Sequence, residues 1–196
     1  MSSTLVDGGA VVTVDDEGTV HDPGWVLVDG DRISEVGGGD APARIRQAAD
    51  EVIEATGAAV MPGMVNGHTH LFQTLFRGLA DDKPLLEWLR DCIWPGATHL
   101  DSEAAYAAAM LGLIENVRGG ATTVVDHQYV HVDAAIDDAV CRAAADIGVR
   151  FVLARGWADR NYHPPLTESA EMVLERIGPV VDAWHGAEDG RVQVGL

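Results

Sequence analysis

The sequence predicts an α/β protein: the first half of a (β/α)8 TIM barrel, about four strands, preceded by a small β-sandwich portion. Two observations predict this fold class. Residues 1–57 alternate apolar and polar positions between Gly and Asp turn signals, which is typical of short strands. From residue 58 onward, apolar segments alternate with Ala-rich helical segments, as they do in βαβ units. The predicted domains are therefore 1–57 and 58–196.

Short strands separated by turn signals dominate the N-terminal domain. Segments 9–14, 24–28 and 32–36 are apolar and lie between Asp-Gly and Asp-Glu-Gly steps that suit hairpins. Residues 51–55 form one more short strand before Gly57. We expect a small antiparallel β unit, the N-terminal part of a β-sandwich domain.

Strands and helices alternate through the second domain. The helix 101–118 ends at Gly119 and Gly120, a common glycine stop. In the helix 167–184, Thr167 is a possible N-cap, and Pro179 after Gly178 predicts a break or kink. The remaining predicted elements are a buried strand 59–65, strands 121–125, 149–154 and 191–196, and a helix 132–147.

The last predicted strand has no turn or cap after it, and a complete barrel usually needs about 250 residues. A half barrel would leave an apolar strand edge uncovered, which favours aggregation. We therefore expect the chain to be part of a longer, truncated polypeptide, or to have this edge covered by something else.

Composition excludes several classes of function. The chain carries 31 acidic and 13 basic residues, a formal net charge of −18, which disfavours binding to nucleic acid or anionic membranes. A GC-rich genome or adaptation to high salt would each explain this balance. No signal peptide or apolar stretch of about 18 residues occurs. Two cysteines, Cys92 and Cys141, do not make a disulfide framework, so we expect a cytoplasmic protein.

The pair His68 and His70 is the strongest chemical signal. Residues two apart in a strand point to the same face, which is the interior in a barrel. Two imidazoles at the carboxyl end of a barrel strand supply half of a zinc or iron site. Histidines that are merely packed and hydrogen-bonded are the alternative. The context favours a metal site, because the pair follows the Pro62–Gly63 turn and opens the α/β region.

At this point the chain resembles a known family. Residues 60–70, VMPGMVNGHTH, resemble the PG(F/L)(V/I)(N/D)xHxH signature of the amidohydrolase superfamily, in its cytosine deaminase and triazine hydrolase branch. The similarity runs along nearly the whole chain. It implies that His68 and His70 bind one divalent transition metal, zinc or iron. It also implies that the other ligands and the acid and base groups follow Leu196.

Residues 70–78, HLFQTLFRG, are similar to a segment of 8-oxoguanine deaminases and of hydroxyatrazine ethylaminohydrolase, which implies that Gln73 faces a heterocycle. A surface glutamine is the alternative. The stretch 84–97 is similar to the segments that cap the barrel mouth and contains Trp88. Relatives that act on adenosine-type nucleosides carry a glutamate at the position of Ala97, so its absence favours a free base or a substituted triazine.

Two later segments agree with this resemblance. Residues 122–129, TTVVDHQY, are similar to 8-oxoguanine deaminases, and there we favour a loop-bracing role for Asp126 and His127 over a catalytic pair. Residues 150–160 are similar to the hydroxyatrazine enzyme, and Arg155 and Trp157 are candidates for the pocket lining. A salt-bridged arginine and a core tryptophan are the alternatives.

The resemblance implies a metal-dependent aminohydrolase that replaces a ring amino or alkylamino group by a carbonyl. A triazine chlorohydrolase and a non-catalytic scaffold of the same fold are the alternatives. The expected partners are a small heterocyclic substrate and further copies of the chain in a homo-oligomer.

Overall fold

The computed structural model describes residues 2–196 and divides into two compact units. One unit ends at Pro62, and the other comprises Gly63–Leu196. None of the helices in the part of the chain that the structure describes is long and apolar enough to span a bilayer.

The N-terminal unit is a five-stranded sheet of order β3-β2-β1-β4, with β5 also paired to β1. Strands β1, β2 and β3 are antiparallel, as predicted. The prediction of an antiparallel unit is wrong for β4, which pairs parallel to β1, and β5 also pairs parallel to β1. A parallel pair needs a crossover connection, and here it includes a helix, α1, that the sequence analysis did not predict. The bounds are β1 (Ser3–Val12), β2 (Val20–Asp29), β3 (Arg32–Gly38), α1 (Ala43–Ala48), β4 (Glu51–Glu54) and β5 (Ala59–Val60).

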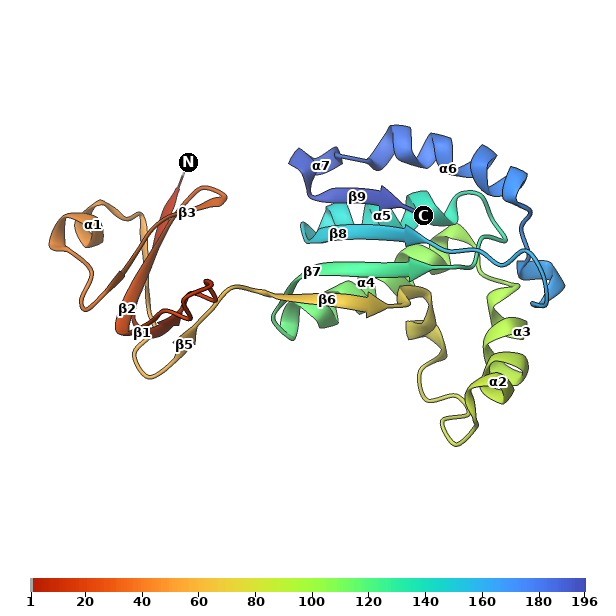
Figure 1. Ribbon diagram of the computed structural model, residues 1–196, viewed down its shortest axis with the longest axis horizontal. Helices are drawn as coiled ribbons and strands as arrows, with labels where there is room; N and C mark the ends of the chain where they lie inside the picture. Colours follow the sequence, from red (N-terminus) through yellow and green to blue (C-terminus); the bar gives the residue numbers. More distant parts are fainter. Residues whose placement is uncertain (1) are drawn as a thin grey trace. The chain divides into compact units, whose positions relative to one another are not determined.

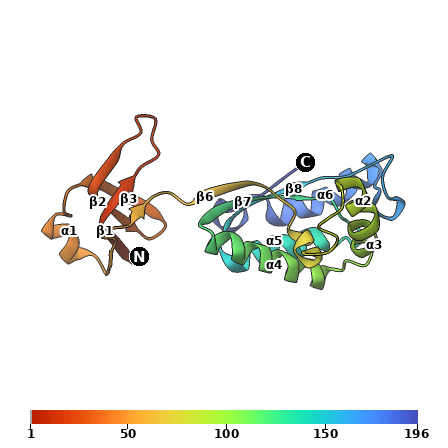
Figure 2. The ribbon, with the colours of Figure 1, turned by 90° about the horizontal axis from the view of Figure 1, so that it is seen from below.

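The second unit is a sheet of four parallel strands in sequence order, β6-β7-β8-β9. Three long helices connect the strands, and Figure 2 shows α4 and α5 together on one face of the sheet. All carboxyl ends of the strands therefore meet at one edge, as in the first half of a barrel (Figure 1). The bounds are β6 (Met64–Thr69), β7 (Ala121–Gln128), β8 (Arg150–Arg155), β9 (Val192–Gly195), α4 (Ser102–Arg118), α5 (Ile136–Ile147) and α6 (Ala170–Trp184).

Several short helices fill the connections. Four of them lie between β6 and α4, in the segment that contributes to the wall of the candidate site: the 3-10 helix η1 (Leu71–Phe76), α2 (Leu85–Trp88), the π-helix η2 (Leu89–Ile93) and α3 (Trp94–Ala97). The other two are the 3-10 helix η3 (Pro164–Leu166), before α6, and α7 (Ala187–Gly190), before β9.

Capping side chains set the helix starts. Asp101 accepts a hydrogen bond from the Ala104 N–H at the start of α4, and Ser169 does the same for Met172 in α6. The predicted cap at Thr167 is therefore wrong by two residues. The helix also continues through Pro179, so the predicted break does not occur. Helix α5 ends at Gly148, whose left-handed φ of 80° suits glycine.

The predicted strand 59–65 is in fact two strands. Residues 59 and 60 form β5 in the N-terminal sheet, whereas β6 begins at Met64 in the other unit. Met64 and Val65 are exposed, and β6 is an edge strand that pairs only with β7 among the described strands. The prediction of a single buried strand is therefore wrong.

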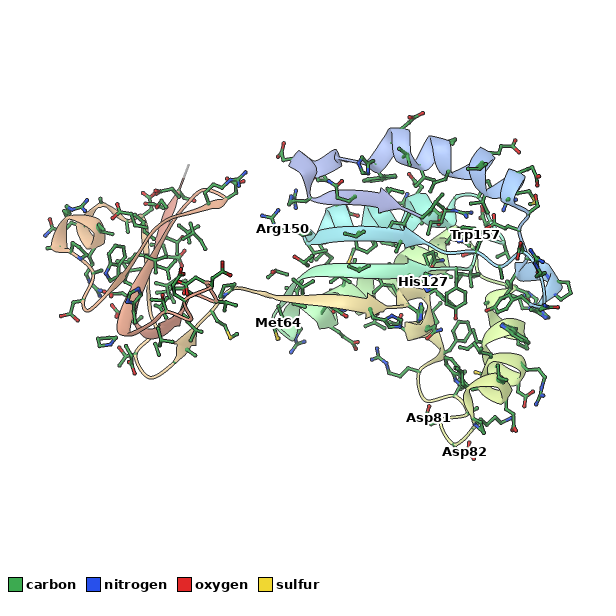
Figure 3. The ribbon with its side chains drawn as sticks, viewed as in Figure 1. Met64, Asp81, Asp82, His127, Arg150 and Trp157 are labelled. Carbon is green, nitrogen blue, oxygen red and sulfur yellow. The ribbon has the colours of Figure 1, made fainter. Side chains whose placement is uncertain are left out.

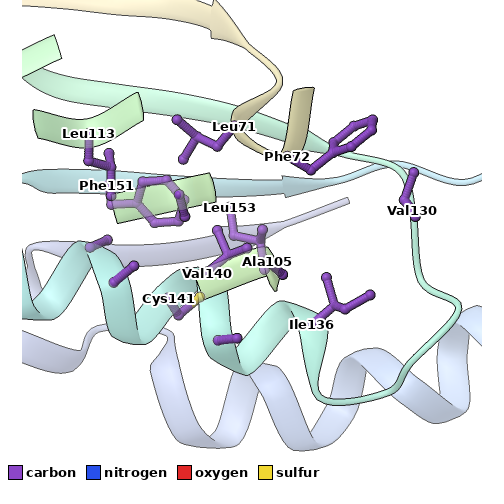
Figure 4. Packing of buried hydrophobic residues seen from close by; sticks show 14 of the residues in the cluster. Leu71, Phe72, Ala105, Leu113, Val130, Ile136, Val140, Cys141, Phe151 and Leu153 are labelled. Carbon is purple, nitrogen blue, oxygen red and sulfur yellow. The ribbon is translucent and has the colours of Figure 1, made fainter. Parts of the chain in front are cut away.

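The main core lies between the parallel sheet and its helices (Figure 4). Phe151 and Leu153 of β8 pack there with Val140 and Cys141 of α5, all of them fully buried. Leu71 of η1 joins the same cluster, so the start of the loop after β6 is part of the core. This packing holds the carboxyl edge of the sheet, where the candidate site lies.

Candidate metal and substrate site

His68 lies on β6, and His70 follows the end of the strand directly. Their ring centroids are 4.9 Å apart, and the rings are nearly perpendicular. His68 is exposed and His70 is half-buried. The structure therefore brings the two predicted ligands together at the carboxyl edge of the sheet.

Asn66 braces the backbone of His68. Its side-chain oxygen accepts a hydrogen bond from the His68 N–H at 3.2 Å, and its amide nitrogen donates to Asn116 of α4 at 2.8 Å. The pairing of β6 with β7 is irregular between Asn66 and Thr69, so this part of the strand lacks a regular ladder. The bond from Asn66 to Asn116 of α4 anchors the strand at this point.

The end of β7 braces His70. Its Nδ1 atom lies 2.8 Å from the backbone carbonyl oxygen of His127. A carbonyl only accepts hydrogen bonds, so Nδ1 carries the proton and Nε2 has a free lone pair. Metal-binding histidines are commonly held in this way by a carbonyl behind the ring. The geometry of His70 thus fits a metal ligand through Nε2.

Asp126 fixes the next residue of the same loop. Its Oδ1 accepts a hydrogen bond from the Leu71 N–H at 2.9 Å. The carboxyl group is fully buried, and this burial raises the pKa of Asp126 to about 7. These contacts are of the loop-bracing kind expected for Asp126, whereas His127 contributes only its backbone carbonyl oxygen to them.

An uncharged pocket opens beside His70, with a volume of about 450 Å³. Gln73, Trp88 and Trp157 all lie in its wall, so the structure brings these predicted residues together. Figure 3 shows His127 and Trp157 at the carboxyl ends of neighbouring strands, opposite the end marked by Met64 and Arg150. We call this cavity the aromatic pocket; its lining is His70, Gln73, Leu85, Trp88, Leu89, His127, Tyr129, Trp157, Ala158 and Tyr162.

A second cavity of about 530 Å³ adjoins it and is more polar. The two cavities share four lining residues: His70, Gln73, Leu85 and Trp88. Arg77 and Lys83 also line the second cavity, but each is paired with a carboxylate, Glu115 and Asp91 respectively. We call it the polar cavity.

Arg155 does not line either cavity, which corrects the prediction of a substrate contact. Its side chain is fully buried and binds Asp137 at 2.8 Å and Glu168 at 2.9 Å. Arg176 binds the same Glu168, and His131 lies 3.0 Å from Asp137, so the buried charges are balanced. The network ties the end of β8 to the start of α5 and to the residues before α6. Arg155 therefore supports the loop that carries Trp157.

The sequence analysis did not predict that His127 and Tyr129 line the pocket. Strand alternation was an available signal, because Val124, Asp126 and Gln128 are buried on the helix side while His127 is exposed. Gly156 makes room for this ring, since a Cβ atom there would lie 2.2 Å from His127 Nε2. Tyr129 is half-buried, and burial raises its pKa above the ordinary value.

Within residues 2–196, no three His, Cys, Asp or Glu side chains are grouped so as to hold a metal ion. The described residues supply a pair of imidazoles. Such a pair suits a transition metal whose remaining ligands come from elsewhere.

The fold and the site define an α/β barrel protein with paired histidines at the carboxyl end of its first barrel strand. Residues 59–196 match the sequence model of the Amidohydrolase family, so the chain belongs to this family.

Curated relatives are named deaminases. A 5'-deoxyadenosine deaminase of Methanothermobacter thermautotrophicus is 39% identical over 88% of this chain and 37% of its own length. A 5-methylthioadenosine/S-adenosylhomocysteine deaminase of Carboxydothermus hydrogenoformans is 32% identical over 87% of this chain and 36% of its own length. The chain thus spans less than half the length of these relatives.

Solved structures confirm the predicted fold class. A variant of the atrazine chlorohydrolase TrzN from Arthrobacter aurescens TC1, complexed with zinc and atraton, superposes with a TM-score of 0.86 at 24% identity. That match covers 98% of this chain and 46% of TrzN. An adenosine deaminase from Xanthomonas campestris with bound zinc has a TM-score of 0.82 and 27% identity, covering 99% of this chain and 42% of its own.

Proposed function

We propose that the chain carries the first half of the active site of a metal-dependent hydrolytic deaminase that acts on an N-heterocycle. The observation that supports this most directly is the pair His68 and His70, with His70 held by the His127 carbonyl so that Nε2 is free. The relatives named as deaminases and the zinc in the solved neighbours support the same reaction class.

His68 and His70 would bind one divalent transition metal. Zinc is the proposed metal, and iron is the alternative. When bound, such a metal lowers the pKa of a coordinated water towards about 7 and supplies hydroxide for attack on the ring carbon. A carboxylic acid from outside the described residues would protonate the leaving amine. The products are a ring carbonyl and ammonia or an amine.

The aromatic pocket would bind the ring. Trp88, Trp157 and Tyr162 supply apolar and aromatic surface for a planar heterocycle. The Gln73 amide can both donate to a ring carbonyl and accept from a ring N–H. Because the lining contains no Asp, Glu, Lys or Arg, it suits a neutral ring.

A free heterocycle, such as 8-oxoguanine, another nucleobase or a hydroxytriazine, is the proposed substrate. Similarity of residues 70–78 and 122–129 to 8-oxoguanine deaminases supports this choice, whereas Ala97 is fully buried in the main core and lines neither cavity. The second candidate is a 5'-modified adenosine, which the names of the curated relatives favour. The polar cavity beside Gln73 offers space for such a substituent.

The decisive experiment measures release of ammonia or alkylamine by the full-length, zinc-loaded protein. The panel contains 8-oxoguanine, isocytosine, guanine, cytosine and hydroxytriazines, together with 5'-deoxyadenosine and methylthioadenosine. We expect turnover of a free base and little turnover of the nucleosides. Turnover of the nucleosides alone would overturn the free-base proposal. A full-length protein that takes up no transition metal and turns over none of these compounds would overturn the deaminase itself and leave a scaffold role.

A further inference from the structure

The walls of the aromatic pocket come from distant parts of the chain. Trp88 of α2 lies in one wall, whereas Trp157 and Tyr162 lie in another. These last two residues belong to the segment 156–163 between β8 and η3, which we call the β8 loop. The shape of the pocket therefore depends on how the β8 loop is held.

Main-chain hydrogen bonds anchor the base of the β8 loop. The Gly156 N–H donates to the Gln128 carbonyl oxygen at 2.7 Å. The Glu168 N–H donates to the Ala158 carbonyl oxygen at 3.0 Å and closes the neck of the loop. Within residues 2–196, by contrast, no main-chain hydrogen bond joins residues 159–162 to another element. Side chains must hold the tip of the loop.

Trp94 of α3 contacts this tip through two rings. The His163 ring is stacked on the Trp94 indole, with planes 7° apart and centroids 5.6 Å apart. The Tyr162 ring meets the same indole edge to face, with centroids 5.1 Å apart. Parallel rings at such a centroid distance are offset, and offset-stacked and edge-to-face pairs are the favourable aromatic geometries. We call the three rings of Trp94, Tyr162 and His163 the tryptophan clasp.

The two sides of the tryptophan clasp differ in their support. Ile93 and Ala97, on either side of Trp94 in the sequence, are fully buried in the main core. On the loop side, the Arg160 side chain is 80% exposed to solvent. The clasp therefore joins an exposed loop tip to a part of the core.

Tyr162 connects the tryptophan clasp to the aromatic pocket. It is half-buried and lines the pocket, whereas Trp94 and His163 line neither cavity. A substitution of Trp94 or His163 thus reaches the pocket through the position of the β8 loop and not through a lost contact with a bound ring.

We propose that Trp94 and His163 are positioning residues whose stack fastens the β8 loop to α3, so that Tyr162 and Trp157 form a fixed wall that limits the size of ring substituents. The part of this inference that concerns the substrate rests on the proposed deaminase function. A wall that is held in place before the ring arrives spares the cost of ordering it on binding. Without the stack, the tip opens more often, because its main chain has no other attachment.

Trypsin cleavage after Arg160 tests the clasp without any substrate, because proteases cut segments that open locally. The experiment compares full-length, metal-loaded wild type, His163→Ala and His163→Phe, with the fragments identified by mass spectrometry. We expect His163→Ala to be cut there about 2- to 10-fold faster, the effect of one lost aromatic pair, and His163→Phe to be cut at the wild-type rate. Cleavage after Arg32, which is 81% exposed in the N-terminal unit, is the internal reference. Equal rates after Arg160 in all three proteins would overturn the clasp.

Steady-state kinetics tests the link from the clasp to the substrate. With the best substrate of the panel, His163→Ala should raise KM about 2- to 10-fold with kcat nearly unchanged, and His163→Phe should restore KM. The preference for this substrate over an analogue with a larger ring substituent should fall by a similar factor in His163→Ala. In a Trp94→Leu background, His163→Ala should change KM by less than about 2-fold, since its stacking partner is gone.

The two measurements separate the ways in which the proposal can fail. An unchanged KM in a His163→Ala protein that trypsin cuts faster refutes the link between clasp and pocket. An equal rise in KM in both backgrounds shows that His163 acts independently of Trp94, which refutes the stack as the cause. If Trp94→Leu does not fold, His163→Ala and His163→Phe decide alone. Wild-type protein that is inactive on the whole panel refutes the deaminase function instead, and the trypsin rates still decide whether the clasp holds the loop.

Discussion

His70 Nδ1 lies 2.8 Å from the backbone carbonyl oxygen of His127, so the end of β7 sets the orientation of a candidate ligand that follows β6. The contact uses the main chain of His127, whereas the imidazole of His127 lines the aromatic pocket. One residue thus contributes to the site in two separable ways, and mutations can distinguish them.

His68→Ala should abolish turnover and lower metal affinity by well over tenfold, because a lost ligand costs more than a lost supporting contact. Metal content after dialysis, measured together with activity on the full-length protein, checks this. His99→Ala is the control, since His99 is exposed and lies outside both cavities. Full activity of His68→Ala would refute the ligand assignment.

His127→Ala should keep the metal. The substitution leaves the backbone carbonyl that holds His70 in place, and it removes only the ring from the pocket wall. We expect unchanged metal content and a raised KM for the heterocycle, of about tenfold, as for a lost pocket contact. A metal content as low as that of His68→Ala would contradict this separation of the main-chain and side-chain roles of His127. It would show that the imidazole of His127 is itself a metal ligand.

Arg155→Met should lower the free energy of unfolding by about 3–5 kcal/mol, because it leaves the buried Asp137 and Glu168 without their shared cation. Denaturant unfolding with a two-state fit measures the loss. Arg160→Met is the control: its side chain is 80% exposed, and surface pairs contribute roughly 0–1 kcal/mol. An equal effect of the two substitutions would show that the buried network adds no stability.

Asp137 should make the fold sensitive to acid. Burial favours its neutral form, but the His131 hydrogen bond and the Arg155 charge outweigh burial and hold the pKa of Asp137 below its ordinary value. A depressed pKa contributes stability above the unfolded-state value of about 4 and loses it as the pH falls further. Unfolding free energies measured from pH 7 to pH 3 should therefore decline more steeply below about pH 4 in the wild type than in Asp137→Asn. Parallel curves would contradict this assignment.

Local sequence signals were sufficient to predict that the long helices and the parallel strands exist and in which order they follow one another. Gly119 after α4 acts locally, so the sequence identifies this helix end. The cap of α6 was misplaced because Thr167 and Ser169 are both suitable residues, and only the hydrogen bond to Met172 distinguishes them. The strand 59–65 was misjudged because its two halves pair with different sheets, which is a property of tertiary structure.

The candidate site residues also divide into those that local patterns reveal and those that depend on tertiary contacts. His68 and His70 are recognisable by spacing, and Gln73 and Trp88 by resemblance, whereas Arg155 was misassigned although it shares its strand face with Phe151 and Leu153. That alternation places Arg155 towards the helices and away from the barrel interior. The Tyr129 bond to Gln73 spans 56 positions, and no local pattern encodes such a pairing.

The buried carboxyl of Asp126 makes two distant stretches of the gene depend on each other. Its only main-chain donor among the described residues is the Leu71 N–H, and its second oxygen is buried without a partner. A chimera that takes residues 66–76 from one relative and 121–131 from another would leave the Asp126 carboxyl group buried without its hydrogen-bond donor wherever the path of the loop differs. The two segments should therefore be exchanged as a single block when the specificity of this enzyme family is engineered.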